Sequence, residues 1–104
     1  MLFMIVFNIT MKIDKDIHDS WMDWMKEESI PDTMATGIFD DYKFYRLLDH
    51  DEHDGITYIV QYFTGSYDGY KKYLDEFHFQ LQQKAFSKWR NRFIAFHTVM
   101  TDVH

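Results

Sequence analysis

The 104-residue chain contains no cysteine, only one proline and only four glycines. Without cysteine it can form neither a disulfide framework nor a zinc-thiolate site, and it offers no thiol nucleophile. No glycine-rich phosphate loop is present, and neither the Ser-x-x-Lys nor the Gly-x-Ser-x-Gly nucleophile motif occurs. The sequence therefore lacks the local motifs that identify several common enzyme classes.

Positive charge is also scarce, because 11 Lys and Arg stand against 17 Asp and Glu, which gives a net charge of −6. Nucleic acids and anionic membranes bind basic surfaces, so neither partner is expected. The apolar start MLFMIVFNIT lacks the basic lead and the cleavage site of a signal peptide, and it is too short to span a bilayer as a helix. We therefore expect a cytoplasmic protein.

Hydrophobic residues, in contrast, make up 46% of the chain, and aromatic residues make up 19%. A chain of this length has the size of one domain, so residues 1–104 are predicted to form a single domain. Each aromatic side chain can bury about 150–250 Å², whereas a small domain has little interior. Part of the aromatic surface is therefore expected to be buried against a partner chain.

Four segments have the periodicity of β-strands. Residues 2–13 alternate with a period of two and are rich in β-branched and aromatic side chains, which predicts a strand. Residues 38–48 and 56–64 read as a second and a third strand, and a last strand runs from residue 93 to about 102.

Two segments between these strands have helical periodicity instead. The first begins near Asp14 or Asp16, either of which can cap it, and Pro31 is expected to end it by disfavouring helical geometry at Ile30. A short further turn can follow the proline and stop at Gly37. Its apolar stripe consists of Ile17, Trp21, Trp24 and Met25.

The second helix is predicted to begin at Ser66, which can cap it. A basic run from Lys84 to Arg92 gathers near its end, where cations suit the helix macrodipole. This run could also bind an anion. The apolar face consists of Tyr67, Tyr70, Tyr73, Leu74, Phe77, Leu81 and Ala85.

The order of these elements is β-α-β-β-α-β, which predicts an α+β, ferredoxin-like fold. Its four-stranded antiparallel sheet would carry both helices on one face. The strands are apolar on both sides, however, so the other face would be left uncovered. A two-fold dimer that packs sheet against sheet solves this problem, since the same patch can meet itself. We therefore predict a homodimer through the sheet face, a dimeric α/β barrel.

The sequence also resembles a family of small, uncharacterised bacterial proteins in the dimeric α/β-barrel superfamily. Three stretches carry the resemblance: WMDWMKEESIPDTMATGIF, RLLDHDEHDGITYIVQYF and RFIAFHTVM. They contain, in order, a Trp-x-x-Trp-Met helix, an Ile-Pro-x-x-x-Ala-Thr-Gly turn and a Gly-Ile-Thr-Tyr strand, and the resemblance covers nearly the whole chain. It implies the fold and the face-to-face dimer, but no activity, because that family has none assigned.

The wider superfamily includes haem-degrading and quinone-forming monooxygenases, dye-decolourising peroxidases, chlorite dismutases and muconolactone isomerases. Their ligands bind between the helices and the sheet or within the barrel, but a shared fold transfers none of these activities. The small haem degraders use an Asn on the first strand, for which Asn8 is suitably placed, with Trp and His on the second helix. That helix has Tyr73 and His78 but no Trp until Trp89, and Ser29 replaces a His that members of the closer family often carry. The incomplete triad argues against haem degradation.

The loop DHDEHDG, residues 49–55, looks at first like a metal site. His50 and His53 could chelate an ion together with Asp51 or Glu52. A flexible hairpin tip does not pre-organise ligands, however, and the spacing does not match that of a calcium loop. The loop is therefore predicted to be a solvated hairpin turn, closed by its Asp-Gly pair and without a bound metal.

Candidate ligand-binding residues come mainly from the sheet face that points away from the helices. If the odd positions of the first strand face the helices, Asn8 faces the barrel. Strand alternation then places Gln61 and His97 beside it, and Arg46 can contribute from the second strand. A few polar groups among aromatic walls are typical of small-molecule pockets. The alternative is that these residues are hydrogen-bonded within the dimer interface.

His78 is the fifth candidate and lies beside the apolar stripe of the second helix. Its ordinary pKa of about 6.5 suits a base, although a lone histidine there is more often a rim residue. The tryptophans Trp21 and Trp24 are interpreted as core, not as part of a cofactor site.

Two classes of function remain. The first is a non-enzymatic dimeric module that binds a small apolar or aromatic molecule, with no cofactor and no identifiable catalytic residue. The alternative is a cofactor-independent monooxygenase or isomerase that acts on an aromatic small molecule, with Asn8, His78 and His97 as polar candidates. Haem or metal binding is a third and less favoured hypothesis.

Overall fold

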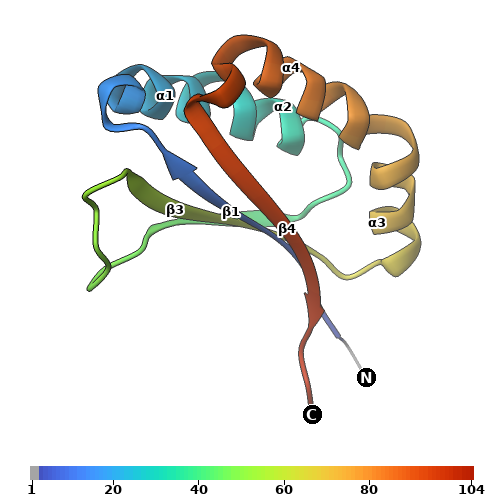
Figure 1. The fold of residues 1–104 in the computed structure, drawn as a ribbon. Helices are drawn as coiled ribbons and strands as arrows, with labels where there is room; N and C mark the ends of the chain where they lie inside the picture. The colour runs from blue at the N-terminus through green and yellow to red at the C-terminus, as the bar shows by residue number, and fades with distance from the viewer. Residues whose placement is uncertain (1–2) are drawn as a thin grey trace.

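The computed structural model describes residues 3–104 and contains one four-stranded antiparallel sheet with its helices on one face (Figure 1). The spatial order of the strands is β2-β3-β1-β4, so β1 and β3 lie at the centre. With two helical segments as crossovers, this is the predicted ferredoxin-like topology. The strands are β1 (Ile5–Ile13), β2 (Asp41–Arg46), β3 (Ile56–Thr64) and β4 (Phe93–Thr101).

The predicted second strand is too long at both ends, because β2 contains only residues 41–46. Gly37 has a φ of 76°, a left-handed conformation that ends the preceding helix, and Phe39 turns into the core before the strand starts. The third strand agrees with the prediction, and the last agrees within a residue. The predicted start of the first strand, Leu2, lies outside the described residues.

The first helical segment is continuous from residue 15 to residue 34. It comprises a 3₁₀ turn η1 (Lys15–Ile17), α1 (His18–Trp24), a π-helical turn η2 (Met25–Ser29) and α2 (Ile30–Met34). Asp14 occupies the position before η1, but its side chain does not cap the helix. Its carboxylate accepts a hydrogen bond from Arg92 Nε at 2.8 Å instead.

Pro31 does not end this segment, so that prediction is wrong. Ile30 has helical dihedral angles of φ −64° and ψ −47°. A proline ring normally clashes with the carbonyl four residues earlier, and the wider π-helical turn just before Pro31 relieves this conflict. Thr33 Oγ1 donates a hydrogen bond to Ser29 O at 3.0 Å across the same turn.

The second helical segment begins as predicted, because Ser66 Oγ accepts a hydrogen bond from Gly69 N at 2.9 Å. It comprises α3 (Tyr67–Tyr73), a second π-helical turn η3 (Leu74–His78), α4 (Phe79–Trp89) and a 3₁₀ turn η4 (Arg90–Arg92). Within residues 3–104, no helix is long and apolar enough to cross a membrane.

The core lies between the sheet and the helices. Odd positions of β1 point into it, and Trp21 from α1 packs against them with no exposed surface. Aromatic side chains from several elements fill the layer, as when the ring of Phe7 lies 5.4 Å from that of Tyr73. The core residues that the strands contribute are Ile5, Phe7, Met11, Ile13, Tyr58, Val60 and Tyr62.

The other face of the sheet, here called the open face, has no helix over it (Figure 1). It carries the even positions of β1 and the residues that pair with them across β3 and β4. Large apolar side chains are exposed here, most clearly Phe96 at 65%. The prediction that the strands are apolar on both faces is therefore confirmed. The exposed apolar members in the strands are Tyr45, Ile94, Phe96 and Met100.

A candidate ligand cavity between the helices and the sheet

A cavity of about 680 Å³ lies between the helical layer and the sheet. Its floor is formed by the helix-facing side of β1, β3 and β4, including Ile9 and Val60. Its walls come from the first helical segment, through Trp24, and from α4, through Leu81 and Ala85. The cavity is therefore assembled from residues that are far apart in the sequence and is mostly apolar.

Two histidines lie at one side of this cavity. His78 ends the π-helical turn η3, and His97 comes from β4. Their rings are 5.0 Å apart and perpendicular, with an interplanar angle of 89°. Both rings also pack against Phe7, at 5.7 Å each. π-Helical turns often occur at functional sites.

Burial lowers the pKa of both histidines. For His78 the cause is the loss of water around the imidazolium. For His97 burial again comes first, and the neighbouring His78 lowers the pKa further. Both imidazoles are therefore neutral at pH 7, and each retains one nitrogen that can accept a proton.

Polar atoms around the cavity lack protein partners. His78 Nδ1 and Trp24 Nε1 are both buried and form no hydrogen bond within the described residues, and both residues line the cavity. Trp89 Nε1 is also buried and forms no hydrogen bond within the described residues. The ring of Trp89 packs edge-on against that of Trp24, with the ring centroids 5.8 Å apart. Buried polar groups nearly always find a partner in native proteins. Within the described residues these three atoms are left without a partner, and none of them is itself exposed in the cavity.

Two buried tyrosines, Tyr62 and Tyr73, line the same cavity. Burial raises the pKa of Tyr62 to about 12. Burial also raises the pKa of Tyr73, with a smaller effect from Tyr62. Both hydroxyls therefore stay protonated at physiological pH and can donate hydrogen bonds.

Asn8 and Gln61 lie on the open face, as predicted, and not in this cavity. They are direct cross-strand partners, and Gln61 Nε2 donates to Asn8 Oδ1 at 3.2 Å. Asn8 Nδ2 donates in turn to Thr10 Oγ1 at 3.2 Å. Asn8 thus uses both its amide oxygen and its amide nitrogen in hydrogen bonds on the open face. Asn8 is also separated by the sheet from His78, so the residues compared with those of the haem degraders do not converge.

The predicted position of His97 on the open face is wrong. In the register of β1 and β4, His97 pairs with Ile9, and cross-strand partners point to the same side of a sheet. His97 therefore shares the helix-facing side with Ile9 and meets His78. The alternation of β4 could not decide this, because both of its sides are apolar.

Arg46 is also placed differently from the prediction. It pairs with Tyr58 on the helix-facing side of the sheet, at the outer strand β2, and it does not line the cavity. Its guanidinium donates two hydrogen bonds to Glu52, Nε to Oε2 at 3.1 Å and Nη2 to Oε1 at 2.7 Å. Arg46 therefore anchors the loop between β2 and β3 and does not contribute to the barrel face.

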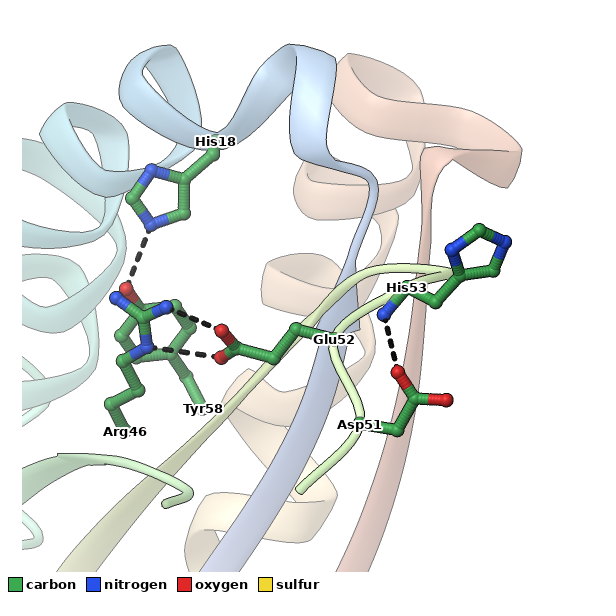
Figure 2. Close-up of polar contacts among 6 residues, drawn as sticks. All are labelled: His18, Arg46, Asp51, Glu52, His53 and Tyr58. Carbon is green, nitrogen blue, oxygen red and sulfur yellow. Dashed lines mark hydrogen bonds and ion pairs between the residues drawn. The ribbon is translucent and has the colours of Figure 1, made fainter. Parts of the chain in front are cut away.

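That loop contains the DHDEHDG sequence, and Figure 2 shows how its side chains are arranged. Glu52 is held by Arg46, and Asp51 accepts a hydrogen bond from the backbone N of His53 at 2.9 Å. The ring of His53 points away from the other labelled residues (Figure 2). Beside this loop, His18 Nε2 and the Tyr58 hydroxyl lie 2.7 Å apart.

The loop connects two antiparallel strands, as a hairpin turn should. Gly55 N donates to Glu52 O at 3.3 Å and closes the turn. A Cβ on Gly55 would lie 2.8 Å from Ile13 O, so only glycine fits there. Among residues 3–104, no three His, Asp or Glu side chains are grouped as metal ligands. The absence of a bound metal stays a prediction.

Trp24, Arg90 and Asn91 line the cavity, but none of them is among the five predicted ligand-binding residues. Trp24 was assigned to the core, and it is indeed buried. A local pattern cannot distinguish a tryptophan that packs only on protein from one that also lines a cavity. The basic run from Lys84 to Arg92 was the only signal that pointed toward Arg90.

Solved structures of dimeric ferredoxin-like proteins share this architecture. One from an uncultured marine organism has a TM-score of 0.72 and 7% identity, with 100% of this chain and 98% of that chain covered. Another, from Thermobifida fusca and of unknown function, has a TM-score of 0.52 and 14% identity, with 93% and 92% covered. SnoaB, a cofactor-independent oxygenase from Streptomyces nogalater, has a TM-score of 0.68 and 12% identity, with 97% and 94% covered. At such identities the likeness shows the fold alone.

The family is defined by sequence. Residues 4–103 match the model of the domain of unknown function DUF4286, so the chain belongs to this family. No curated protein is similar enough in sequence to count as a match. The family has no assigned function, so a functional proposal has to start from the site itself.

Proposed function

We propose that the chain binds a small aromatic or otherwise apolar molecule in the cavity between the helices and the sheet. One observation carries this proposal: the cavity is mostly apolar, and its lining includes a few polar side chains, among them His78 and His97. Small-molecule pockets typically measure about 300–1,000 Å³, with apolar walls and a few polar groups that orient the ligand. The volume of about 680 Å³ lies within this range.

We further propose that the functional unit is a homodimer joined through the open face. The exposed side chains of Phe96 and Met100 supply an apolar surface that a second copy can cover. Two structural neighbours are described as dimeric, which supports this assembly. A two-fold axis lets the same patch meet itself. The cytoplasmic location stays a prediction.

Isothermal titration with 2-naphthamide, an uncharged aromatic probe, tests the cavity. We expect the wild-type protein to bind the probe. An Ala85→Trp variant should not, because the indole would fill the cavity that Ala85 lines. Ser87→Trp is the matched control, since Ser87 is exposed on the same helix and does not line the cavity. Absence of binding to the wild type, or equal binding to the Ala85→Trp variant, would contradict the proposal.

A second candidate function is a cofactor-independent oxygenation or isomerisation of the bound aromatic molecule. The observation that favours it is the pair of neutral imidazoles, His78 and His97, at the cavity wall. A neutral imidazole can remove a proton from a phenolic hydroxyl, and the resulting electron-rich phenolate can be oxidised by O₂. SnoaB, which shares the fold, is described as a cofactor-independent oxygenase.

Oxygen uptake with 1,5-dihydroxynaphthalene tests this candidate. In the balanced reaction one O₂ is consumed, one oxygen atom enters the ring to give 5-hydroxy-1,4-naphthoquinone, and the other leaves as water. We expect the rate of quinone formation to fall at least about tenfold in His97→Ala if the imidazole acts as a base. A wild-type rate no higher than that of buffer would reject the oxygenase, while leaving the binding proposal intact.

A further inference from the structure

The four basic residues of the run near the end of α4 have different environments; they are Lys84, Lys88, Arg90 and Arg92. Lys84 Nζ lies 2.8 Å from Glu28 Oε1 and 2.7 Å from Asp32 Oδ2, so it ties α4 to the first helical segment. Arg92 pairs with Asp14 at 2.8 Å and also with Asp16. Both cations are thus neutralised by carboxylates.

The remaining two cations have no carboxylate. Lys88 Nζ lies over the ring of Trp89, 5.3 Å from its centroid. Arg90 forms no ion pair with any residue in the range 3–104, although the chain has a net charge of −6. Of the four, Arg90 alone lines the cavity. An acidic protein thus presents an unpaired guanidinium at the edge of its apolar cavity.

The backbone of Arg90 is strained. Its φ of 52° with ψ of −125° is a conformation that favours glycine, and a side chain there costs about 1–3 kcal/mol. Its backbone N–H donates to Phe86 O and closes α4, a role that glycine would fill without strain. Strain of this kind persists at ligand-binding positions, where the side chain has a use that offsets it.

We propose that Arg90 binds a carboxylate on the cavity's ligand, so that the ligand class is an aromatic or apolar carboxylic acid. This inference rests on the proposed function of the cavity. The apolar body of the ligand lies among Trp24, Leu81 and Ala85, and its carboxylate lies at the Arg90 end. Asn91, which follows Arg90 and also lines the cavity, offers an amide N–H to the same group.

A carboxylate fits this site better than a phosphate. The planar guanidinium presents two parallel N–H groups that match the two oxygens of one carboxylate. One cation neutralises one negative charge, and the other cations of this segment are already engaged. The chain also lacks the glycine-rich loop that usually surrounds a phosphate.

Isothermal titration with a matched pair of probes, 2-naphthoate and 2-naphthamide, tests the inference. The two differ only in whether the carboxyl group is charged or an uncharged amide. We expect wild type to bind 2-naphthoate at least about tenfold more tightly, since hydrogen bonds to charged groups contribute about 1.5–3 kcal/mol. Arg90→Gln should abolish this preference and leave the affinity for 2-naphthamide unchanged. Lys88→Gln, with the same loss of charge, should keep the preference.

The outcomes separate this inference from the proposed function. If neither probe binds wild type, the cavity proposal fails and this inference fails with it. If wild type binds both probes equally, only the inference about Arg90 is overturned. If Arg90→Gln weakens the binding of both probes equally, Arg90 has a structural role. If Arg90→Gln and Lys88→Gln reduce the preference for 2-naphthoate equally, the preference comes from the overall positive charge of this segment. Either result would also overturn the inference.

Discussion

The two faces of the sheet differ in whether the polar atoms on them have hydrogen-bond partners. On the open face, Asn8 and Gln61 are cross-strand partners, and Gln61 Nε2 donates a hydrogen bond to Asn8 Oδ1. On the helix-facing side, His78 Nδ1 and Trp24 Nε1 are buried without a partner within the described residues. A hydrogen-bonded polar pair among apolar side chains suits an interface, whereas a mostly apolar cavity lined by a few polar side chains suits a ligand. The comparison supports the two proposals, assembly through the open face and ligand binding on the helix-facing side.

Truncating a core side chain on the helix-facing side of the sheet should lower the free energy of unfolding more than truncating an exposed side chain. Trp21 is fully buried in the core, so Trp21→Ala should lower the free energy of unfolding by about 3–5 kcal/mol. Urea denaturation followed by circular dichroism measures this change. Phe79→Ala, which truncates a side chain that is 70% exposed on α4, is the control and should change stability by about 0.5 kcal/mol or less. Equal effects of the two changes would contradict the observed core.

A substitution on the open face should change the stability of the proposed dimer. Phe96→Asp places a charge in the middle of the proposed interface and should weaken the dimer at least about 30-fold, as expected for an interface hot spot. Light scattering coupled to size exclusion measures the mass. Phe79→Asp introduces the same charge at a phenylalanine that is 70% exposed on α4 and should leave the dimer intact. A monomeric wild type would reject the sheet-to-sheet dimer.

Ligand binding should distinguish the two faces directly. His97→Ala, on the cavity side, should weaken 2-naphthamide binding by about tenfold through lost contact and a lost hydrogen bond. Asn8→Ala, on the open face, should leave the affinity unchanged and should instead weaken the dimer. Titration calorimetry and sedimentation velocity measure these two readouts. The reverse pattern, with Asn8→Ala losing the probe, would place the ligand within the barrel.

A fall in pH should lower the stability of the folded protein through the two histidines at the cavity. The folded pKa values of His78 and His97 are lowered by burial, whereas the unfolded value is about 6.5. The unfolded state therefore binds more protons below that pH, so stability is retained above about pH 6.5 and lost as the pH falls toward the folded values. Thermal melts between pH 7.5 and pH 5 should show this loss. His97→Gln should reduce it, whereas His53→Gln, at an exposed loop position, should not.

The smallest effect is expected from relieving the strain at the cavity edge. Arg90→Gly should raise the free energy of unfolding by up to about 1 kcal/mol, because glycine adopts a φ of 52° without a steric penalty. Differential scanning calorimetry would detect a higher melting temperature. The variant should lose the preference for 2-naphthoate. A lower melting temperature would show that the Arg90 side chain contributes more to stability than its backbone conformation costs.

Most of the fold could be predicted because its signals are local. The alternation of β1 and β3, the cap at Ser66 and the glycine at the end of the β2–β3 loop each act within a few residues. The predicted helix end at Pro31 was wrong because a π-helical turn, which has no simple sequence signature, accommodates the proline. The position of Asn8 on the open face followed from the alternation in β1. That of Gln61 followed from alternation in β3, where the sequence alone left the buried side undecided, and the pairing with β1 decided it.

The placement of His97 and Arg46 could not be predicted in the same way. Both lie on the outer strands β4 and β2, where apolar and polar residues do not alternate cleanly, so only the register with a central strand decides the face. A slip of one residue moves every side chain to the other side. The pairing of β4 with β1 brings His97 opposite Ile9 and thus toward His78.

By itself, the sequence determined the elements, their order and an uncovered apolar sheet face, because hydrophobic periodicity and caps are properties of neighbouring residues. Tertiary structure alone decided where a ligand can bind. The cavity is a volume left unfilled where α1, α4 and the central strands meet, and no single segment encodes it. The same is true of Arg90, whose lack of a carboxylate partner follows from how the acids of the first helical segment pair with Lys84 and Arg92.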